Sequence, residues 1–256
     1  MTRRRFYAPP ATFAPGEQTV VLTAEEVRHA RDVLRLQTGD EVYVFDGEGK
    51  EFRCAVREFG RDGAVFNVIE EVEPARPESP LDLTLAVALL KGEKFDLVIQ
   101  KATELGVTRI IPLDSERADM RIRGGEDMHK RVTRWRRIAR EAAKQSGRAR
   151  VPEIIASLTL DALLTTPAAE EEKSSIRLMF SERGGRSLHE AIDNFSERPA
   201  KIVALVGPEG GWTDNEIELA REDGWQIVTL GGRTLRAETA AIVVAALLQH
   251  RFGDLA

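Results

Sequence analysis

From residue 81 onward, short apolar runs alternate with helix-like segments, and this alternation constrains the fold more than any other feature. The apolar runs are residues 83–89, 109–113, 176–180, 202–206 and 226–230. Several are apolar at nearly every position, which is typical of strands that helices cover on both faces of a sheet. Helical patterns occupy residues 93–105, 126–145, 158–164, 187–194, 213–222 and 238–252. The alternation predicts an α/β fold with a largely parallel sheet, whose ligands bind at the carboxyl ends of the strands.

The beginning of the chain has a different pattern. Residues 1–73 contain β-rich runs separated by turn signals, at 20–22, 41–45, 52–56 and 64–68. A helix-like stretch at 23–36 opens with Thr23 and Glu26, a spacing typical of a capping box. These residues predict a small β-barrel with one helix.

A cluster of prolines separates the two patterns. Pro74, Pro77 and Pro80 stand among charged and small residues, as in a linker. We therefore predict two domains, residues 1–73 and 81–256, joined by a linker at 74–80.

Composition excludes several classes of protein. Of the 256 residues, 42% are hydrophobic, enough for a packed core, yet no apolar run is long enough to span a bilayer. The only cysteine is Cys54, and there are four scattered histidines, so neither an internal disulfide nor a Cys/His metal cluster is expected. We expect a cytoplasmic protein without a bound metal.

Charge is unevenly distributed along the chain. The net charge is −5, but residues 117–150 hold twelve Lys and Arg against four Asp and Glu. Such a basic segment on an acidic body indicates an anionic partner, and we favour a nucleic acid over a merely solvated helix face. Within it, the apolar spacing predicts that Trp135 is a core residue and does not stack on bases.

Two glycine-rich segments follow the last two predicted strands. Residues 205–212 read Leu-Val-Gly-Pro-Glu-Gly-Gly-Trp, and residues 230–240 read Leu-Gly-Gly-Arg-Thr-Leu-Arg-Ala-Glu-Thr-Ala. Glycine lets a ligand lie against bare backbone, and helix starts offer N–H donors. Neither segment has the pattern of a dinucleotide or triphosphate loop. One such segment fits a tight strand-to-helix turn, whereas two favour the walls of one small-molecule site.

Further short motifs occur in a fixed order along the chain. They are Arg4-Arg5-Phe6-Tyr7, residues 29–35 with Gly39-Asp40, residues 91–94, 100–107 and 145–148 with Val151-Pro152, and the two glycine-rich segments. Together they resemble the RsmE family of SPOUT RNA methyltransferases, which methylate N3 of uridine 1498 in 16S ribosomal RNA. The resemblance covers nearly the whole chain.

The resemblance implies a trefoil-knotted α/β methyltransferase domain and an N-terminal PUA-like barrel that binds RNA. It implies S-adenosylmethionine as cofactor, a homodimer with the knot helices at its interface, and 16S rRNA or the small ribosomal subunit as partner. The cofactor lies between loops at 180–182, 205–211 and 230–240, with Leu230 and Leu235 packed on its adenine. Carried onto this sequence, the cofactor-binding residues are Phe180, Ser181, Glu182, Leu205, Gly207, Gly211, Leu230, Gly231, Leu235, Arg236, Thr239 and Ala240.

The reaction suggests roles for the charged residues of the glycine-rich segments. Uracil N3 carries a proton and lies on the Watson–Crick edge, so the target base must be unpaired. We predict Arg236 and Glu238 as catalytic residues, with Glu209 and Glu238 as candidates for the base. The alternative for Glu238 is a carboxylate that stabilises the start of a helix. Arg236 has three possible roles: it orients Glu238, holds a uracil carbonyl or holds a phosphate.

Polar and basic residues of the motifs and of the basic segment are the predicted RNA contacts. They are Arg4, Arg5, His29, Arg31, Arg35, Lys91, Lys94, Arg134, Gln145 and Arg148.

Two other functions stay open at this point. A non-catalytic RNA-binding ribosome assembly factor would keep the fold without the chemistry, and the intact segment 236–240 argues against it. A SPOUT methyltransferase with another target, such as a tRNA ribose, is disfavoured by the Arg-Arg-Phe-Tyr and Gln-Ser-Gly-Arg motifs. The leading expectation is an S-adenosylmethionine-dependent rRNA (uracil-N3) methyltransferase.

Overall fold

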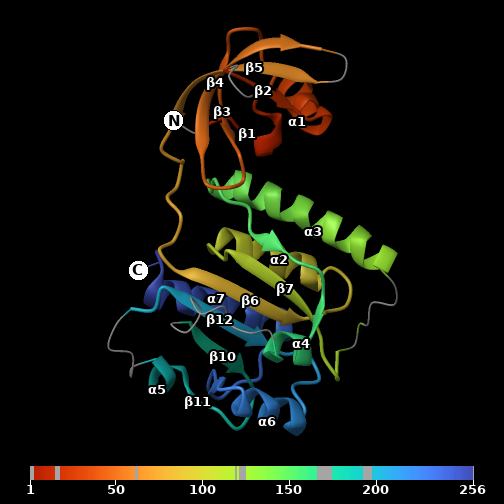
Figure 1. Cartoon of the computed structure of the whole chain (residues 1–256), viewed down its shortest axis with the longest axis vertical. Coiled ribbons are helices and arrows are strands. Elements are labelled where there is room, and N and C mark those ends of the chain that lie inside the picture. Colours follow the sequence, from red (N-terminus) through yellow and green to blue (C-terminus); the bar gives the residue numbers. More distant parts are fainter. Residues whose placement is uncertain are drawn as a thin grey trace. The chain divides into compact units, whose positions relative to one another are not determined.

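The computed structural model describes residues 3–14, 18–60, 63–118, 120, 125–165, 175–192 and 198–255. The chain forms two compact units (Figure 1). The first comprises Met1–Glu78 and Arg140–Val151, and the second comprises Ser79–Ala139 and Pro152–Ala256. The sequence analysis assigned residues 140–151 to the second domain. The structure places them in the first unit, because their contacts are made with residues far away in the sequence.

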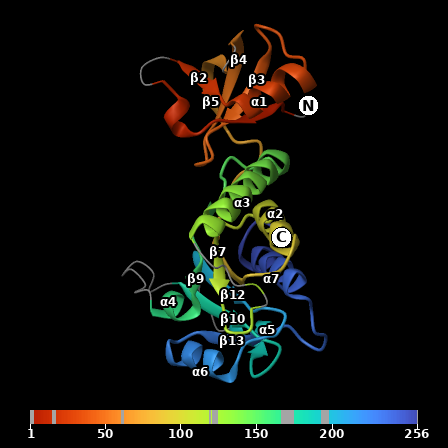
Figure 2. The ribbon, with the colours of Figure 1, turned by 90° about the vertical axis from the view of Figure 1, so that its right-hand side faces the viewer.

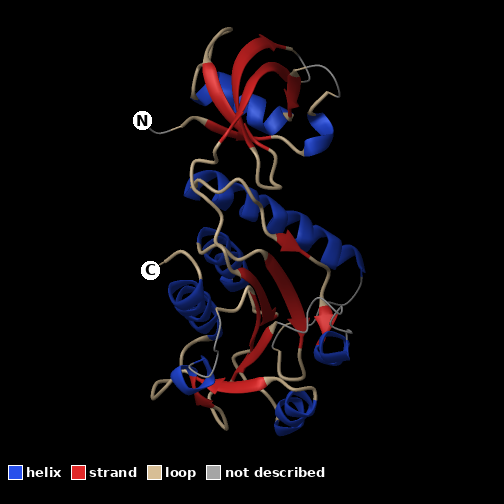
Figure 3. Ribbon diagram, turned by 60° about the vertical axis from the view of Figure 1, so that its left-hand side comes forward, coloured by secondary structure: helices blue, strands red, loops and turns tan. Residues whose placement is uncertain are grey.

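The first unit is built on a five-stranded sheet of order β1-β3-β4-β5-β2. Its strands are β1 (Arg5–Tyr7), β2 (Thr19–Leu22), β3 (Glu41–Phe45), β4 (Glu51–Phe59) and β5 (Ala64–Val72). The β1–β3 pair is parallel and the other pairs are antiparallel. Figure 3 shows these strands curling into a half-barrel. Its core is apolar and includes the alternate residues Val42, Val44, Cys54, Val56, Ala64 and Phe66.

Short helical segments complete the half-barrel. They are the 3-10 turn η1 (Pro10–Thr12), the helix α1 (Ala24–Arg28) and the π-helical turn η2 (His29–Val33). The predicted capping box at the start of α1 is wrong, because the side chain of Thr23 makes no capping hydrogen bond. Glu26 instead turns into the unit, where its carboxylate is buried and accepts a 2.7 Å hydrogen bond from the Lys144 ammonium.

The second unit is a parallel sheet of order β11-β13-β10-β12-β6-β7-β8, with β9 also paired to β7. The strands are β6 (Asp82–Ala88), β7 (Arg109–Asp114), β8 (Glu153–Ile154), β9 (Leu158–Thr159), β10 (Ile176–Phe180), β11 (Arg186–Ser187), β12 (Lys201–Val206) and β13 (Gln226–Thr229). All their described pairings are parallel, which confirms the predicted sheet.

Helices cover both faces of this sheet (Figure 2). They are α2 (Lys94–Glu104), α3 (Gly125–Ser146), α4 (Leu160–Thr165), α5 (Leu188–Ile192), α6 (Asp214–Glu222) and α7 (Ala237–Phe252). On one face α7 packs against α2, β6 and β12. On the other, α4 and α6 cover an apolar cluster that includes Ala86, Met179, Leu205 and Ile227 from four strands. The chain leaves β13, which lies beyond β10, and returns as α7 beside β6 and β12. The trefoil knot stays a prediction of the resemblance.

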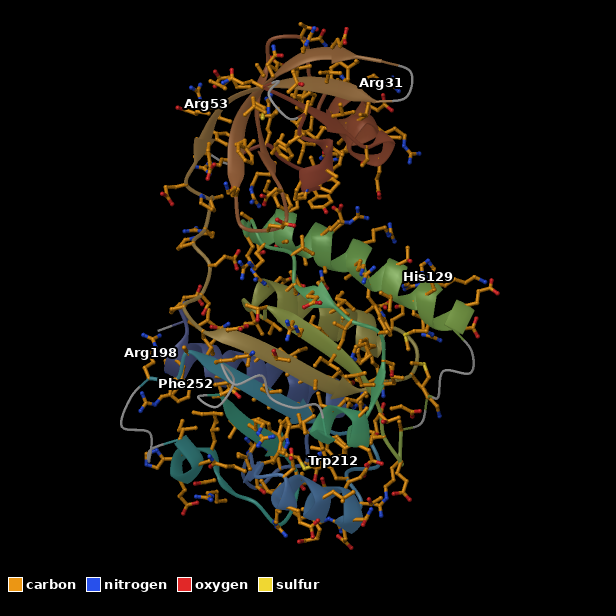
Figure 4. All side chains as sticks on the ribbon, in the orientation of Figure 1. Arg31, Arg53, His129, Arg198, Trp212 and Phe252 are labelled. Atoms are coloured by element: carbon orange, nitrogen blue, oxygen red, sulfur yellow. The ribbon has the colours of Figure 1, made fainter. Side chains whose placement is uncertain are left out.

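One side chain anchors the middle of α3, and another satisfies the end of α7. Trp135 of α3 is buried, stacks on Phe95 with ring centroids 4.5 Å apart and donates from its indole to Asp96, which confirms its assignment to the core. At the end of α7, the Arg198 guanidinium donates to the carbonyl oxygens of Phe252 and Gly253, each at 2.6 Å (Figure 4). These last carbonyls have no partner inside the helix, so the arginine satisfies them.

The described part of the chain contains no helix that is both long and apolar enough to cross a membrane. The sequence-based strands of both units match observed ones within a few residues. The strands that were missed, β1, β8, β9 and β11, have two or three residues each. Such short strands have no periodicity to detect.

The buried thiol of Cys54 gives a test of the half-barrel core. Burial raises the pKa of Cys54 to about 12, and its sulfur is fully covered. Because thiolates are the reactive form, we expect the thiol of native protein at pH 8 not to react with an aromatic disulfide that releases a coloured product. The same reagent should modify one thiol per chain in denaturant. Rapid reaction of native protein would contradict the packing of β4.

Candidate active site

Three loops of the second unit surround a cavity of about 590 Å³. They follow β10, β12 and β13, and the last leads into α7. The register aligns Phe180 with Val206 on one side and with Val228 on the other, so the three strands end side by side. The cavity therefore lies at the carboxyl edge of the sheet, as the sequence predicted. It is lined by Phe180, Ser181, Glu182, residues 206–212, residues 229–237 and Ala240.

The indole of Trp212 joins two of these loops. The side chain is fully buried, and its Nε1 donates to the Phe180 carbonyl at 2.9 Å. Figure 4 shows Trp212 inside the second unit, close to α6. Its own carbonyl accepts hydrogen bonds from Arg117 and Arg183. The next residue, Thr213, starts α6 with a capping box, in which its hydroxyl accepts from the Glu216 N–H and the Glu216 carboxylate accepts from the Thr213 N–H. The loop after β12 is thus fixed by both side-chain and backbone bonds.

Two glycines of the same loop are required by close contacts. A Cβ on Gly207 would lie 2.9 Å from the Trp212 ring. A Cβ on Gly211 would lie 2.5 Å from a Glu182 carboxylate oxygen, and Gly211 has a φ of +66°. Since such a φ strains any residue with a side chain, the backbone conformation requires glycine at 211. At Gly207 the requirement comes from space, because the rigid, buried Trp212 ring occupies the position that a Cβ would need.

Four charged groups gather beside the cavity. The Lys94 ammonium donates to the cavity-lining Glu209 carboxylate at 2.7 Å, and this hydrogen bond raises the pKa of Lys94. Glu238 and Arg236 also act electrostatically on Lys94, so all four lie in one neighbourhood. Glu238 is only 9% exposed, and its Oε2 has no hydrogen-bond partner among the described residues.

Most of the predicted cofactor-binding residues line the cavity. They are Phe180, Ser181, Glu182, Gly207, Gly211, Leu230, Gly231, Leu235, Arg236 and Ala240. Two predicted cofactor-binding residues, Leu205 and Thr239, do not line it, and neither does the predicted catalytic residue Glu238. Leu205 belongs to the apolar cluster under α4 and α6. Successive residues of a strand point to opposite faces, so Leu205 faces away from the side to which its neighbour Val206 points. Thr239 is exposed and Glu238 is buried, and neither lines the cavity.

Other lining residues were not singled out from the sequence. They are Val206, Pro208, Gly210, Trp212, Thr229, Gly232, Arg233, Thr234 and Ala237, while Glu209 was predicted only as a candidate base. All stand inside or directly beside the glycine-rich segments, so the presence of these segments was the sequence signal that could have identified them. Sequence position does not tell which side chains of a loop face the ligand.

Two predicted RNA contacts, Arg5 and Arg148, are buried in ion pairs. Arg5 is 8% exposed and binds the fully buried Glu51 through two nitrogens, at 3.2 and 3.1 Å. It also donates to the carbonyls of Ala143, Lys144 and Arg148 and thereby caps the end of α3. Arg148 is 5% exposed and donates to the Glu78 carboxylate at 3.0 and 2.7 Å. Both guanidinium groups are therefore bound to carboxylates of the protein itself.

The remaining predicted RNA contacts are at least partly accessible. Arg4, Arg35, Lys91 and Gln145 are exposed, and Arg35 has a φ of +53°. His29 is half-buried against Phe6. Three others already have acidic partners: Arg31 pairs with Asp32, Arg134 with Asp96 and Lys94 with Glu209. An exposed ion pair contributes little to stability, so these cations can exchange partners at small cost.

The buried Arg5–Glu51 pair predicts a large difference between two adjacent arginines. Arg5→Ala leaves the buried Glu51 carboxylate with Arg3, at 3.2 Å, as its remaining cation, and it leaves the carbonyls at the end of α3 without their donor. We therefore expect the free energy of unfolding to fall by about 2 kcal/mol. Arg4→Ala, on the exposed neighbour, is the matched control and should change it by less than about 0.5 kcal/mol. Urea unfolding measures both. Equal effects would contradict the buried pair.

Gly207 and Gly232 form a second matched pair, since both line the cavity. Gly207→Ala should displace the fully buried Trp212, with a stability loss of about 2 kcal/mol. It should also weaken binding of S-adenosylmethionine, the cofactor that the resemblance implies, by about tenfold or more. A Cβ on Gly232 meets no atom within 4 Å, so Gly232→Ala should fold as the wild type does. Calorimetry gives the affinities and thermal unfolding the stabilities. Equal behaviour of the two variants would contradict the role of Trp212.

The sequence matches two family models. Residues 77–249 match the RNA methyltransferase domain, and residues 22–69 match the RNA methyltransferase PUA domain. The chain is 40% identical over 230 residues to ribosomal RNA small subunit methyltransferase E of Synechocystis, covering 90% of this chain and 72% of that protein. It is 31% identical to the protein of that name from Bacillus subtilis, covering 91% and 90%.

Solved structures agree with the sequence relatives. Ribosomal RNA small subunit methyltransferase E of Neisseria gonorrhoeae, bound to S-adenosylmethionine, superposes over the full length of both chains with a TM-score of 0.85 and 34% identity. A methyltransferase of Legionella pneumophila in complex with the same cofactor gives 0.86 and 32%, again over both full chains. With its PUA half-barrel, its parallel SPOUT-type domain and these matches, the chain belongs to the ribosomal RNA small subunit methyltransferase E (RsmE) family.

Proposed function

We propose that this protein uses S-adenosylmethionine to methylate N3 of uridine 1498 in 16S rRNA. The observation that carries the proposal is the cavity at the ends of β10, β12 and β13, formed by the same glycine-rich loops that carry the family resemblance. The names of the relatives support rRNA of the small subunit as substrate. The RsmE resemblance supports the particular base and position.

The cavity fits the cofactor in size and lining. Sites for ligands of this size commonly enclose about 300–1,000 Å³, and this one has about 590 Å³. Apolar side chains such as Leu230 and Leu235 offer a surface for adenine, and the glycines at 207, 210, 211, 231 and 232 expose backbone groups. The two related structures that hold S-adenosylmethionine support the same ligand here.

When bound, the cofactor supplies a methyl group on a positively charged sulfur. The protein's own residues must then position the uracil, take up its N3 proton and stabilise the charge that develops on the uracil carbonyl oxygens. Arg236 lines the cavity and has no ion pair in the described part of the chain, so its guanidinium is available to a carbonyl oxygen.

The two candidate bases differ in placement. Glu209 lines the cavity, where Lys94 holds its carboxylate in place, and this supports Glu209 as the group that takes up the proton. Glu238 is buried behind the cavity lining at the start of α7, where a carboxylate stabilises the helix. We propose that Glu238 is a positioning residue that acts through its charged neighbours Lys94 and Arg236.

Accessible basic residues support an RNA partner. On the half-barrel these are Arg4, Arg31 and Arg35 beside His29, and on α3 they include Arg134. Lys91 and Lys94 stand at the start of α2, which follows β6 on the carboxyl edge of the sheet. We place these residues against the rRNA backbone of the small subunit, in the cytoplasm where the subunit is assembled.

A strip of exposed apolar side chains supports a homodimer. Leu97 on α2 is 40% exposed and Leu247 on α7 is 38% exposed, and Ile242 and Val243 are partly exposed on the same helix. The two helices pack together, and such strips commonly mark contacts between subunits. Leu247→Glu should yield monomers in light scattering, while Val21→Glu, which changes an equally exposed residue of the half-barrel, should not.

Arg236→Ala tests the chemistry. Because Arg236 is exposed, unfolding should be unchanged within about 0.5 kcal/mol. Loss of a group that stabilises developing charge lowers kcat by about 10²–10³. Single-turnover methyl transfer to rRNA measures the step. Arg109→Ala is the control, since Arg109 starts β7 at the opposite edge of the sheet. Comparable loss in both variants would contradict the role of Arg236.

Mapping of methylated uridines in rRNA from a deletion strain tests the function itself. We expect N3 methylation of uridine 1498 to disappear and to return with the wild-type gene. Retention of the mark with defective subunit assembly would instead indicate the non-catalytic assembly factor. Loss of a methyl group elsewhere, such as on a tRNA ribose, would indicate another target.

A further inference from the structure

We propose that Arg233 is an oxyanion-binding residue of this site, which takes either the carboxylate of S-adenosylmethionine or a phosphate of the target nucleotide. The inference rests on the proposed function and adds a residue to it. Arg233 lies on the loop between β13 and α7, lines the cavity and is exposed.

The argument begins with the charges around the cavity. Glu209 pairs with Lys94. Arg183 lies 3.8 Å from Glu182, pairs with Asp214 and donates to the Trp212 carbonyl. Arg117 donates to the carbonyls of Gly210 and Trp212. These cations already serve the protein, because they hold the loop after β12 in place.

Arg233 differs from these cations. Within the part of the chain that the structure describes, it has neither an ion pair nor a side-chain hydrogen bond, and no aromatic ring lies against its guanidinium. Arg236 also lines the cavity, but Glu238 and Glu209 share its electrostatic neighbourhood through Lys94. Arg233 is therefore a cavity-lining cation whose charge no described carboxylate balances.

The backbone around Arg233 keeps the guanidinium accessible. Gly231 has a φ of +85°, and a Cβ on either Gly231 or Gly232 would meet no atom within 4 Å. Thr234 is also exposed. The loop thus presents Arg233 on an open rim and does not pack it into the core. A planar guanidinium with several donors favours carboxylate and phosphate, which it binds through two oxygens.

Both reactants of the proposed reaction carry such a group. The methionine part of the cofactor ends in a carboxylate, and the target nucleotide is flanked by phosphates. Titration calorimetry with S-adenosylmethionine and with 5′-methylthioadenosine tests the cofactor carboxylate, since 5′-methylthioadenosine lacks it. Filter binding of a 16S rRNA fragment over a range of salt concentrations tests the phosphate.

Three full-length variants carry the test. Arg233→Ala removes the cation, and Arg233→Lys keeps the charge without the two-oxygen geometry. The control Arg109→Gln removes a partly exposed cation, paired with Glu153, from the opposite edge of the sheet. Thermal unfolding of all three should match the wild type, because Arg233 makes no contact that folding needs. For whichever ligand binds more weakly to Arg233→Ala, the affinity of Arg233→Lys should lie between those of Arg233→Ala and the wild type.

A carboxylate partner predicts that Arg233→Ala weakens S-adenosylmethionine about tenfold and leaves 5′-methylthioadenosine unchanged. A phosphate partner predicts unchanged cofactor affinity, weaker binding of the rRNA fragment and a salt slope smaller by about one. Either pattern supports the proposal. If the wild type binds both ligands and Arg233→Ala binds them equally well, the role of Arg233 is overturned while the proposed function stands. A wild type that binds neither ligand overturns the proposed function as well.

Discussion

The parallel register of β10 with β12 and β13 is the constraint on which the site depends. Because Phe180, Val206 and Val228 lie level with one another, the loops that follow the three strands start along one line. A slip of one residue would turn the apolar side chains of a strand to the other face of the sheet and move its loop away. The strands carry apolar side chains on both faces, and helices cover both faces. Packing of these side chains against the helices therefore stabilises the observed register.

Within that frame, a single tryptophan determines how the loops meet. Trp212 is bonded to the Phe180 carbonyl, fits against a residue that must be glycine and receives two arginines on its own carbonyl. Arginines near the cavity consequently fall into two kinds. Arg117 and Arg183 bind backbone oxygens and hold the loop, whereas Arg233 and Arg236 face the cavity. Shape and charge at this site are therefore supplied by different residues.

The sequence predicted the parts of the structure that follow from local pattern. Apolar runs located the long strands, and the glycine-rich segments located the cavity, because both signals are short in range. The buried ion pairs of Arg5 and Arg148 were not predicted, because their carboxylate partners, Glu51 and Glu78, are distant in the sequence. In a sequence, a basic residue that pairs with a buried carboxylate cannot be distinguished from one that binds a phosphate. The membership of residues 140–151 in the first unit was missed for the same reason.

That membership has a consequence for how the chain folds during synthesis. The half-barrel is encoded first, but the carbonyl oxygens that Arg5 caps belong to Ala143, Lys144 and Arg148. When residue 78 leaves the ribosome, Arg5 and Glu51 can meet, yet three of the arginine's acceptors do not exist. Domains generally fold as units in the order of their synthesis. Here the first unit stays incomplete until residues 140–151 have been synthesised, by which time more than a third of the second unit has been translated as well.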